Sequence, residues 1–598
     1  MTSYLCDFLD YTEHGTIYDF DLQNLQRFKI AEAGNLFSLN LSSGRIGILA
    51  QHARAIELAS LLHNFADAHA ANPILGLSEC KLTNSGVNLK EKARIAIIGG
   101  GISGTACLMS LKGLGFKKID LFEASSCLLH KQKLSKHRHA HPVYNDWPLE
   151  EREFSSATNM PVLNWFADSV AEIIDTMTLD PNFDCLEDDD HVQFAKIVET
   201  IRPGKDELKD EINLEVRSPF SSTTKRIGPF DIVISAAGLG EERYLESSYS
   251  RSYWWPDYIP NLKSEVSTHE KHLTFVVGDG DGGLIDVLRL LAPLNDDHSE
   301  RNVPWEIVAE ARHDEAKVLD YDGQRTGKKS KIETEAKKLS KIGDTERFLD
   351  ALQGDLSKFL EEHIDAEQFL ENIFLVSKGS KPFAQNASLI SKILFGFAVN
   401  NRREILLDGR WVPSSKSLQI ERDCMTRAGL TPTKVKNGQK VIRIGPENPL
   451  GTKIKIDGIS QKKKLKLVNA THGNFLSHEN RRGADGDVRY NGILVDEFTK
   501  NLPFDYNSTQ SAYFHEWRSL LISKYLRRVF GKNSTYEIIP ATPETDAYVE
   551  LQLEDTELNR SAYRRIGGFD RKLFGYNVKY SIRGSGEVAA EISEVSYG

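Results

Sequence analysis

Short apolar runs alternate with stretches of helical periodicity over the first half of the chain. Residues 95–98, 119–122, 230–236 and 273–277 are mostly apolar and rich in β-branched residues. Runs of about four to eight such residues, bounded by turn residues, are typical of strands buried on both faces of a parallel sheet. Two of these runs lead through a glycine turn into a helix-length segment, at 105–114 and at 284–294. This alternation predicts an α/β protein.

The flanking segments have patterns of their own. Residues 1–92 contain an apolar, strand-like piece at 46–49 and apolar residues at helical spacing over 53–70, which predicts an α/β appendage. The runs described above fall in a region that we bound at residues 93–313. Residues 314–372 are rich in Lys, Glu and Asp at helical periodicity, which predicts a helical insertion or lid.

The C-terminal part is less regular. A mixed α/β region is predicted over residues 373–535, with strands at 371–377 and 465–473 and a helix at 387–400. Residues 536–598 alternate apolar and polar side chains, which predicts a small β-rich C-terminal unit. A strand is also predicted over 191–201, between the first two apolar runs and the third.

The turn after the first apolar run carries glycines at a fixed spacing. Gly99 permits a tight turn, Gly101 leaves room for the backbone to approach a pyrophosphate, and Gly104 lets the following helix pack closely on the strand. The helix N-terminus offers free N–H groups to phosphate oxygens. Glu123 ends the next strand, where a carboxylate can accept hydrogen bonds from ribose hydroxyls. The order of strand, turn, helix, strand and acid predicts a dinucleotide site, whose turn also contributes Ile102 and Ser103.

Residues 97–104, taken with Phe122-Glu123-Ala124-Ser125, resemble the FAD-binding start of the two-dinucleotide-domain flavoproteins. The resemblance implies that residues 93–313 form a Rossmann-type FAD/NAD(P)-binding region with two glycine-rich turns. It also implies that FAD is the cofactor. Residues 230–238 resemble the strand of the same proteins that returns to the sheet and passes the bound nucleotide, which would bring Ala237 and Gly238 to the cofactor.

A second glycine turn follows the fourth apolar run, with Gly278, Gly280 and Gly283 at the same spacing as in the first turn. Two interpretations stay open. The turn begins a second strand-helix-strand unit that binds NAD(P), with its second strand at 305–311 and Glu310 or Arg312 near the ribose. Alternatively, residues 274–279 resemble the strand of the same flavoproteins that ends in Gly-Asp, and Asp279 bonds the ribityl chain of FAD.

The segment from His137 to Pro148 is dense in functional side chains. Its candidate catalytic residues are Arg138, His139, His141 and Tyr144, which could contact a flavin ring or a substrate and shuttle protons. The His-x-His-x-His spacing also admits a metal site, although no Cys or Glu partner marks one, so we predict no metal. A proline-braced structural loop is the third interpretation.

The composition excludes several classes of protein for this chain. Hydrophobic residues make up 40% and charged residues 27%, as in ordinary globular proteins, and the net charge of −10 argues against a nucleic-acid binder. The six cysteines lie far apart, which argues against a disulfide framework or a zinc finger. No apolar run reaches the length of a membrane span, and the N-terminus lacks the features of a signal peptide. We therefore predict a cytoplasmic protein.

These features predict a soluble flavin-dependent oxidoreductase that binds FAD and uses NAD(P)H as electron donor. The expected partners are a small-molecule substrate or a nicotinamide nucleotide, with no nucleic acid and no membrane. The C-terminal part could support a homo-oligomer or a protein partner. The alternative is a non-catalytic sensor or assembly module that binds FAD or NAD without turnover.

Overall fold

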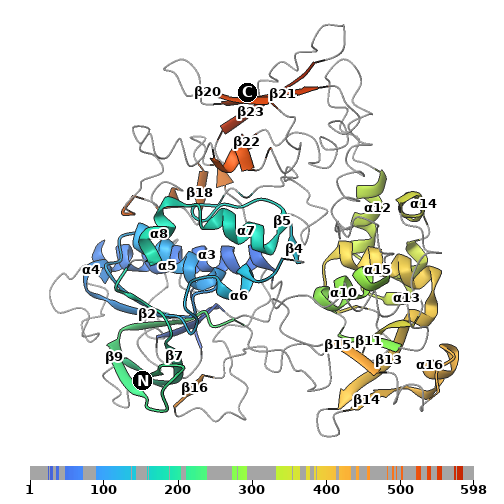
Figure 1. The fold of residues 1–598 in the computed structure, drawn as a ribbon, viewed down its shortest axis with the longest axis horizontal. Helices are drawn as coiled ribbons and strands as arrows, with labels where there is room; N and C mark the ends of the chain where they lie inside the picture. The colour runs from blue at the N-terminus through green and yellow to red at the C-terminus, as the bar shows by residue number, and fades with distance from the viewer. Residues whose placement is uncertain are drawn as a thin grey trace, which may run out of the picture.

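The computed structural model is drawn in Figure 1, with the described helices and strands in colour. The described residues fall within 25–71, 89–142, 158–203, 211–238, 273–291, 331–431, 439–443, 454–457, 481–502, 520–526 and the strands of 535–583, with gaps inside several of these ranges. The predicted strands at 305–311 and 465–473 lie outside the described residues, as do His137, Tyr144 and Asp279. Within the described ranges the protein is mixed α/β, as predicted.

The first sheet has five strands, all parallel. In spatial order they are β1 (Leu36–Ser38), β10 (Ile232–Ser235), β2 (Arg94–Ile98), β3 (Lys118–Phe122) and β6 (Val192–Gln193). When β2, β3, β6 and β10 are numbered along the chain, they lie in the order 3-2-1-4. This order matches the first four positions of the Rossmann order 3-2-1-4-5-6, and it places β2 at the centre of the sheet.

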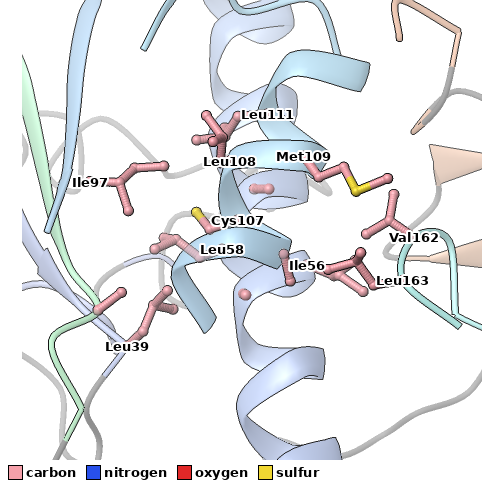
Figure 2. Packing of buried hydrophobic residues seen from close by; sticks show 14 of the residues in the cluster. Leu39, Ile56, Leu58, Ile97, Cys107, Leu108, Met109, Leu111, Val162 and Leu163 are labelled. Carbon is pink, nitrogen blue, oxygen red and sulfur yellow. The ribbon is translucent and has the colours of Figure 1, made fainter. Parts of the chain in front are cut away.

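Two long helices, α3 (Ile48–Ala71) and α5 (Ile102–Gly113), pack on this sheet and on each other. Figure 2 shows Ile56 and Leu58 of α3 beside Cys107, Leu108 and Met109 of α5. The helix predicted over 53–70 is confirmed but begins earlier, so the strand-like prediction at 46–49 is wrong for Ile48 and Leu49. A run of four apolar residues can begin a buried helix as readily as form a strand.

A meander of three antiparallel strands separates β6 from β10 in the chain. Its strands are β7 (Ile197–Pro203), β8 (Ile212–Arg217) and β9 (Lys225–Phe230), and the short β16 (Lys455–Ile456) joins its edge. The prediction of a single strand over 191–201 is wrong, because an irregular segment separates β6 from β7. Ala195 adopts a positive φ of 52° there, and its N–H donates to the Ser125 carbonyl at 3.0 Å.

The second sheet repeats the strand order of the first. Its spatial order is β14 (Ser417–Ile420), β13 (Leu406–Val412), β12 (Ile373–Ser377), β11 (Leu273–Val277) and β15 (Gln439–Arg443). The strands β15, β11, β12 and β13 are parallel, and β14 is antiparallel. Numbered along the chain, the parallel strands again lie in the order 3-2-1-4, with β11 at the centre.

Helices cover the second sheet. The helix α10 (Asp281–Leu291) follows β11, and α15 (Leu389–Asn401) follows β12 and packs on α10. The predicted helical insertion contains α12 (Lys331–Ser340), α13 (Thr345–Ala351) and α14 (Asp355–His363). Apolar residues of these helices, including Phe348 and Leu360, are buried against α15, so the insertion shares a core with this unit.

The predicted β-rich C-terminal unit contains a four-stranded sheet. Its strands are β20 (Thr535–Ile539), β21 (Tyr548–Glu554), β23 (Tyr576–Arg583) and β22 (Lys572–Leu573). Among the helices that the structure describes, none combines the length and apolar character needed to span a membrane.

Candidate functional site

The first glycine turn joins the carboxyl end of β2 to the start of α5. Gly99 has a φ of +103°, a region that favours glycine, and its N–H donates to the Phe122 carbonyl at 2.8 Å. A Cβ on Gly104 would lie 1.8 Å from the Gly99 carbonyl oxygen. The chain's own packing therefore requires glycine at both positions.

Gly101 differs from its neighbours because the fold does not require a glycine there. Its φ of −75° and ψ of −173° suit any residue, and a Cβ would meet only the Gln132 Nε2, at 3.6 Å. Among the described residues, no side chain caps the first N–H groups of α5. An open face on Gly101 beside uncapped N–H groups is the geometry that a pyrophosphate needs.

Glu123 lies at the end of β3 and closes the other side of this turn. Its Oε2 accepts the Gly100 N–H at 2.5 Å, and its Oε1 accepts the Ser125 N–H at 2.7 Å. A carboxylate has about four acceptor sites, so capacity for ribose hydroxyls remains. The sequence prediction that Glu123 accompanies the glycine turn thus agrees with the position of its side chain.

The end of β10 completes the first turn. The Ala236 N–H donates to the Ile98 carbonyl at 2.8 Å, and a Cβ on Gly99 would lie 2.6 Å from the Ala236 oxygen. The next residues, Ala237 and Gly238, are exposed, and Gly238 has a φ of +78°. The structure therefore brings the predicted Ala237 position beside the glycine turn.

The second glycine turn repeats these features residue by residue. Gly278 has a φ of +116°, and its N–H donates to the Val376 carbonyl at 3.1 Å, as Gly99 does to Phe122. A Cβ on Gly283 would lie 2.1 Å from the Gly278 oxygen, whereas nothing lies within 4 Å of a Cβ on Gly280. β11 pairs with β12 on one side and with β15 on the other, so it belongs to the second sheet, whereas the predicted role of Asp279 lies outside the described residues.

Charge at the second turn differs from charge at the first. Ser377 follows Val376 as Glu123 follows Phe122, so a neutral residue stands where the first unit has its acid. The Asp281 Oδ1 accepts the Ser388 N–H at 2.8 Å and the Ser388 hydroxyl at 2.6 Å. This carboxylate is therefore tied to the start of α15.

The described part of the predicted catalytic segment, residues 138–142, contacts the second unit. His139 and Ala140 form the short strand β4 (His139–Ala140), which pairs with β5 (Asp168–Ser169). The Arg138 guanidinium pairs with the Asp286 carboxylate of α10, the helix that follows the second glycine turn. Arg138 therefore contacts the second unit, a partnership that no sequence signal indicates.

His141 is buried, and burial lowers its pKa to about 3. The ring is therefore uncharged at neutral pH. Its predicted use as a proton shuttle relied on a pKa near neutrality, which this environment does not provide. Among the described residues, no group of three or more His, Cys, Asp and Glu side chains could hold a metal ion.

Comparisons with known proteins give only solved structures of low similarity. No family model matches the chain, and no curated protein matches it. A structure of OTEMO with FAD and NADP is 12% identical with a TM-score of 0.20, covering 33% of this chain and 36% of its own. The first structures are thus matched over well under two thirds of their own length.

Two further structures also match at low sequence identity and low TM-score. The ornithine N-hydroxylase of Kutzneria sp. 744, with FAD, NADP+ and L-ornithine, is 13% identical with a TM-score of 0.22, covering 39% of this chain and 63% of its own. The polycyclic ketone monooxygenase of the fungus Thermothelomyces thermophila is 13% identical with a TM-score of 0.29, covering 80% of this chain and 87% of its own. Likeness at this level assigns neither a family nor an activity.

Proposed function

We propose that the protein is a flavin-dependent oxidoreductase that holds FAD at the first glycine turn and a nicotinamide nucleotide at the second. The observation that carries this proposal is the repetition of one geometry at the centres of two sheets. In each unit the first glycine has a positive φ and bonds to the neighbouring strand, and the last glycine packs on its carbonyl. Two dinucleotide sites in one chain fit a protein that passes electrons between two nucleotides.

FAD is assigned to the first turn because its features fit an adenine dinucleotide. Gly101 leaves room for the pyrophosphate, and Glu123 retains acceptor capacity for the ribose hydroxyls. The remaining contacts in this proposal come from Ile102 and Ser103 at the start of α5, and from Ala237 and Gly238 after β10. When bound, FAD supplies the ring that accepts and returns two electrons.

The nicotinamide nucleotide is assigned to the second turn. Gly278, Gly280 and Gly283 would hold its pyrophosphate as their counterparts do in the first unit, and Asp279 follows Gly278 in the loop. Ser377 stands at the ribose position, where an acid would otherwise select a free 2′-hydroxyl. Because a neutral residue at this position does not repel a 2′-phosphate, the proposed site could take NADP(H) as well as NAD(H).

The segment around β4 is proposed to face the space between the bound nucleotides. Arg138 joins this segment to α10, and His139 and Tyr144 are its candidates for contact with a substrate or for proton transfer. His141 would act there as an uncharged, structural ring. A small organic molecule is the proposed substrate, and the cytoplasm is the proposed compartment.

An absorbance spectrum of the purified protein tests the proposal. The expected result is a flavin spectrum that bleaches when NADH or NADPH is added without oxygen, and a Gly101→Val variant that lacks it. A folded, colourless protein that binds no FAD would contradict the proposal. A colourless protein that binds only NAD would instead support a non-catalytic nucleotide sensor.

A further inference from the structure

The N-terminal strand occupies a position in the first sheet that its place in the chain does not predict. β1 precedes the glycine turn, yet it pairs with β10 on the far side from β3, in register from Leu36 with Val233 to Ser38 with Ser235. The Leu39 N–H continues this pairing to the Ser235 carbonyl at 2.9 Å. β1 therefore fills the fifth position of the order 3-2-1-4-5. In a Rossmann fold numbered along the chain, a strand that follows the fourth one fills this position.

Because β1 is parallel to its neighbours, its carboxyl end lies at the same edge of the sheet as the glycine turn. Ligands of open α/β sheets bind outside this edge. The helix α3 starts from this edge, as α5 does, and its apolar face is buried against α5 (Figure 2). The first turns of the two helices are thus held side by side by a shared core.

A hydrogen bond joins these first turns. The Ser103 hydroxyl, at the start of α5, donates to the Gln51 Oε1 of α3 at 2.8 Å. Ser103 is buried and Gln51 is half-buried. Among the described residues, the Gln51 amide nitrogen has no hydrogen-bond partner. It belongs to the same amide group as the Oε1 that Ser103 holds. The Gln51 amide group therefore lies at the first turn of α5, beside Ser103 and two residues after Gly101.

We propose that β1 and α3 are an integral wall of the first nucleotide site, and that the Gln51 amide donates a hydrogen bond to the diphosphate of the bound dinucleotide. This inference rests on the proposed function, which places a dinucleotide at the first turn. A neutral amide donor suits a phosphate oxygen, and the bond from Ser103 fixes its orientation. The N-terminal segment, predicted from sequence to be an appendage, would thus take part in binding.

The test compares ligands with and without a diphosphate. Full-length protein freed of bound nucleotide is titrated calorimetrically with ADP and with adenosine, as wild type and as Gln51→Glu. This variant keeps the acceptor for Ser103 and replaces the donor by a negatively charged oxygen. Gln419→Glu, at an exposed position in the second sheet, is the charge-matched control. If Gln51→Glu does not fold, Gln51→Asn replaces it in the test, because the shorter side chain moves the amide donor away from the proposed diphosphate position.

The expected result is that Gln51→Glu weakens ADP binding by about ten- to a hundred-fold and changes adenosine binding by less than about two-fold. Gln419→Glu should bind both ligands as the wild type does. Unchanged ADP affinity in the Gln51 variant would overturn the inference. Equal losses for ADP and adenosine would also overturn it, because they would mark a purely structural role. If wild type binds neither ADP nor FAD, the proposed function itself fails.

Discussion

Arg138 and Asp286 form an ion pair between the two α/β units, and their side chains are 10% and 2% exposed. Arg138 precedes β4 in the first unit, and Asp286 belongs to α10 in the second. Removing one partner of a buried pair leaves an uncompensated charge, which is far more costly than removing both. This pair therefore ties the relative position of the two glycine turns to the stability of the protein.

We expect Asp286→Ala to destabilise the protein by about 3–5 kcal/mol, because it removes one partner of a buried ion pair and keeps the other. The double variant Arg138→Met with Asp286→Leu should lose less than either single variant. Urea unfolding followed by circular dichroism measures both. The control is Glu215→Ala, which breaks a half-exposed pair with Arg202 and should cost much less than Asp286→Ala. Equal costs for the buried and the half-exposed pair would contradict the argument.

Two neighbouring glycines should respond in opposite ways to substitution. Gly101→Val should leave the fold intact and abolish FAD binding, because its backbone angles suit valine and its Cβ would enter the proposed ligand space, with only the Gln132 side chain within 4 Å. Gly104→Ala should instead destabilise the protein by about 1–3 kcal/mol or more, since its Cβ would overlap the Gly99 carbonyl oxygen. Thermal unfolding and flavin content, measured on both variants, separate the two effects. Full flavin content in a folded Gly101→Val variant would refute the assignment of the first turn.

Glu123→Ala should weaken FAD binding by about ten- to a hundred-fold, because hydrogen bonds to a charged group are worth about 1.5–3 kcal/mol each. Part of this loss would come from the turn itself, since the carboxylate also accepts the Gly100 and Ser125 N–H groups. Glu123→Gln keeps one acceptor oxygen and should lie between wild type and Glu123→Ala. Fluorescence titration with FAD gives the three affinities. Identical affinities would show that the ribose hydroxyls are bound elsewhere.

Local patterns were enough to predict the parts of the fold that short-range chemistry controls. The strand, glycine turn and helix at Gly99 follow from a spacing that forces one backbone path, and the acid at Glu123 follows from the length of a strand-helix-strand unit. The same spacing at Gly278 predicted the second turn. The sequence left open which sheet held that turn, because sheet membership depends on pairing between distant segments.

The features that the sequence did not reveal are long-range ones. The strand that pairs with β11 as β3 pairs with β2 is β12, and it lies beyond the whole helical insertion in the chain. Because of this distance, Ser377 was not recognised from the sequence as the counterpart of Glu123. The position of β1 beyond β10 and the Gln51–Ser103 bond depend on segments about fifty to two hundred residues apart. The Arg138–Asp286 pair spans 148 residues, and nothing in either local pattern indicates it.

Buried histidines should make the protein less stable in acid. Burial lowers the pKa of His141 to about 3 and that of His52 to about 4, from an ordinary value of 6.5. Below pH 6.5 the unfolded chain binds protons at these rings and the native protein does not, so the free energy of unfolding falls as the pH falls. Each ring contributes a slope of up to about 1.36 kcal/mol per pH unit, which ends near its native pKa.

We therefore expect the urea midpoint to fall steadily from pH 6.5 towards pH 4, and the double variant His52→Asn with His141→Asn to show a shallower fall. Asparagine keeps a polar side chain without titrating in this range. His191→Asn is the matched control, because that ring is exposed, at 56%, and pairs with Asp120. Midpoints measured at half-unit pH steps decide the question. An unchanged pH dependence in the double variant would mean that other groups, and not these two rings, control acid stability.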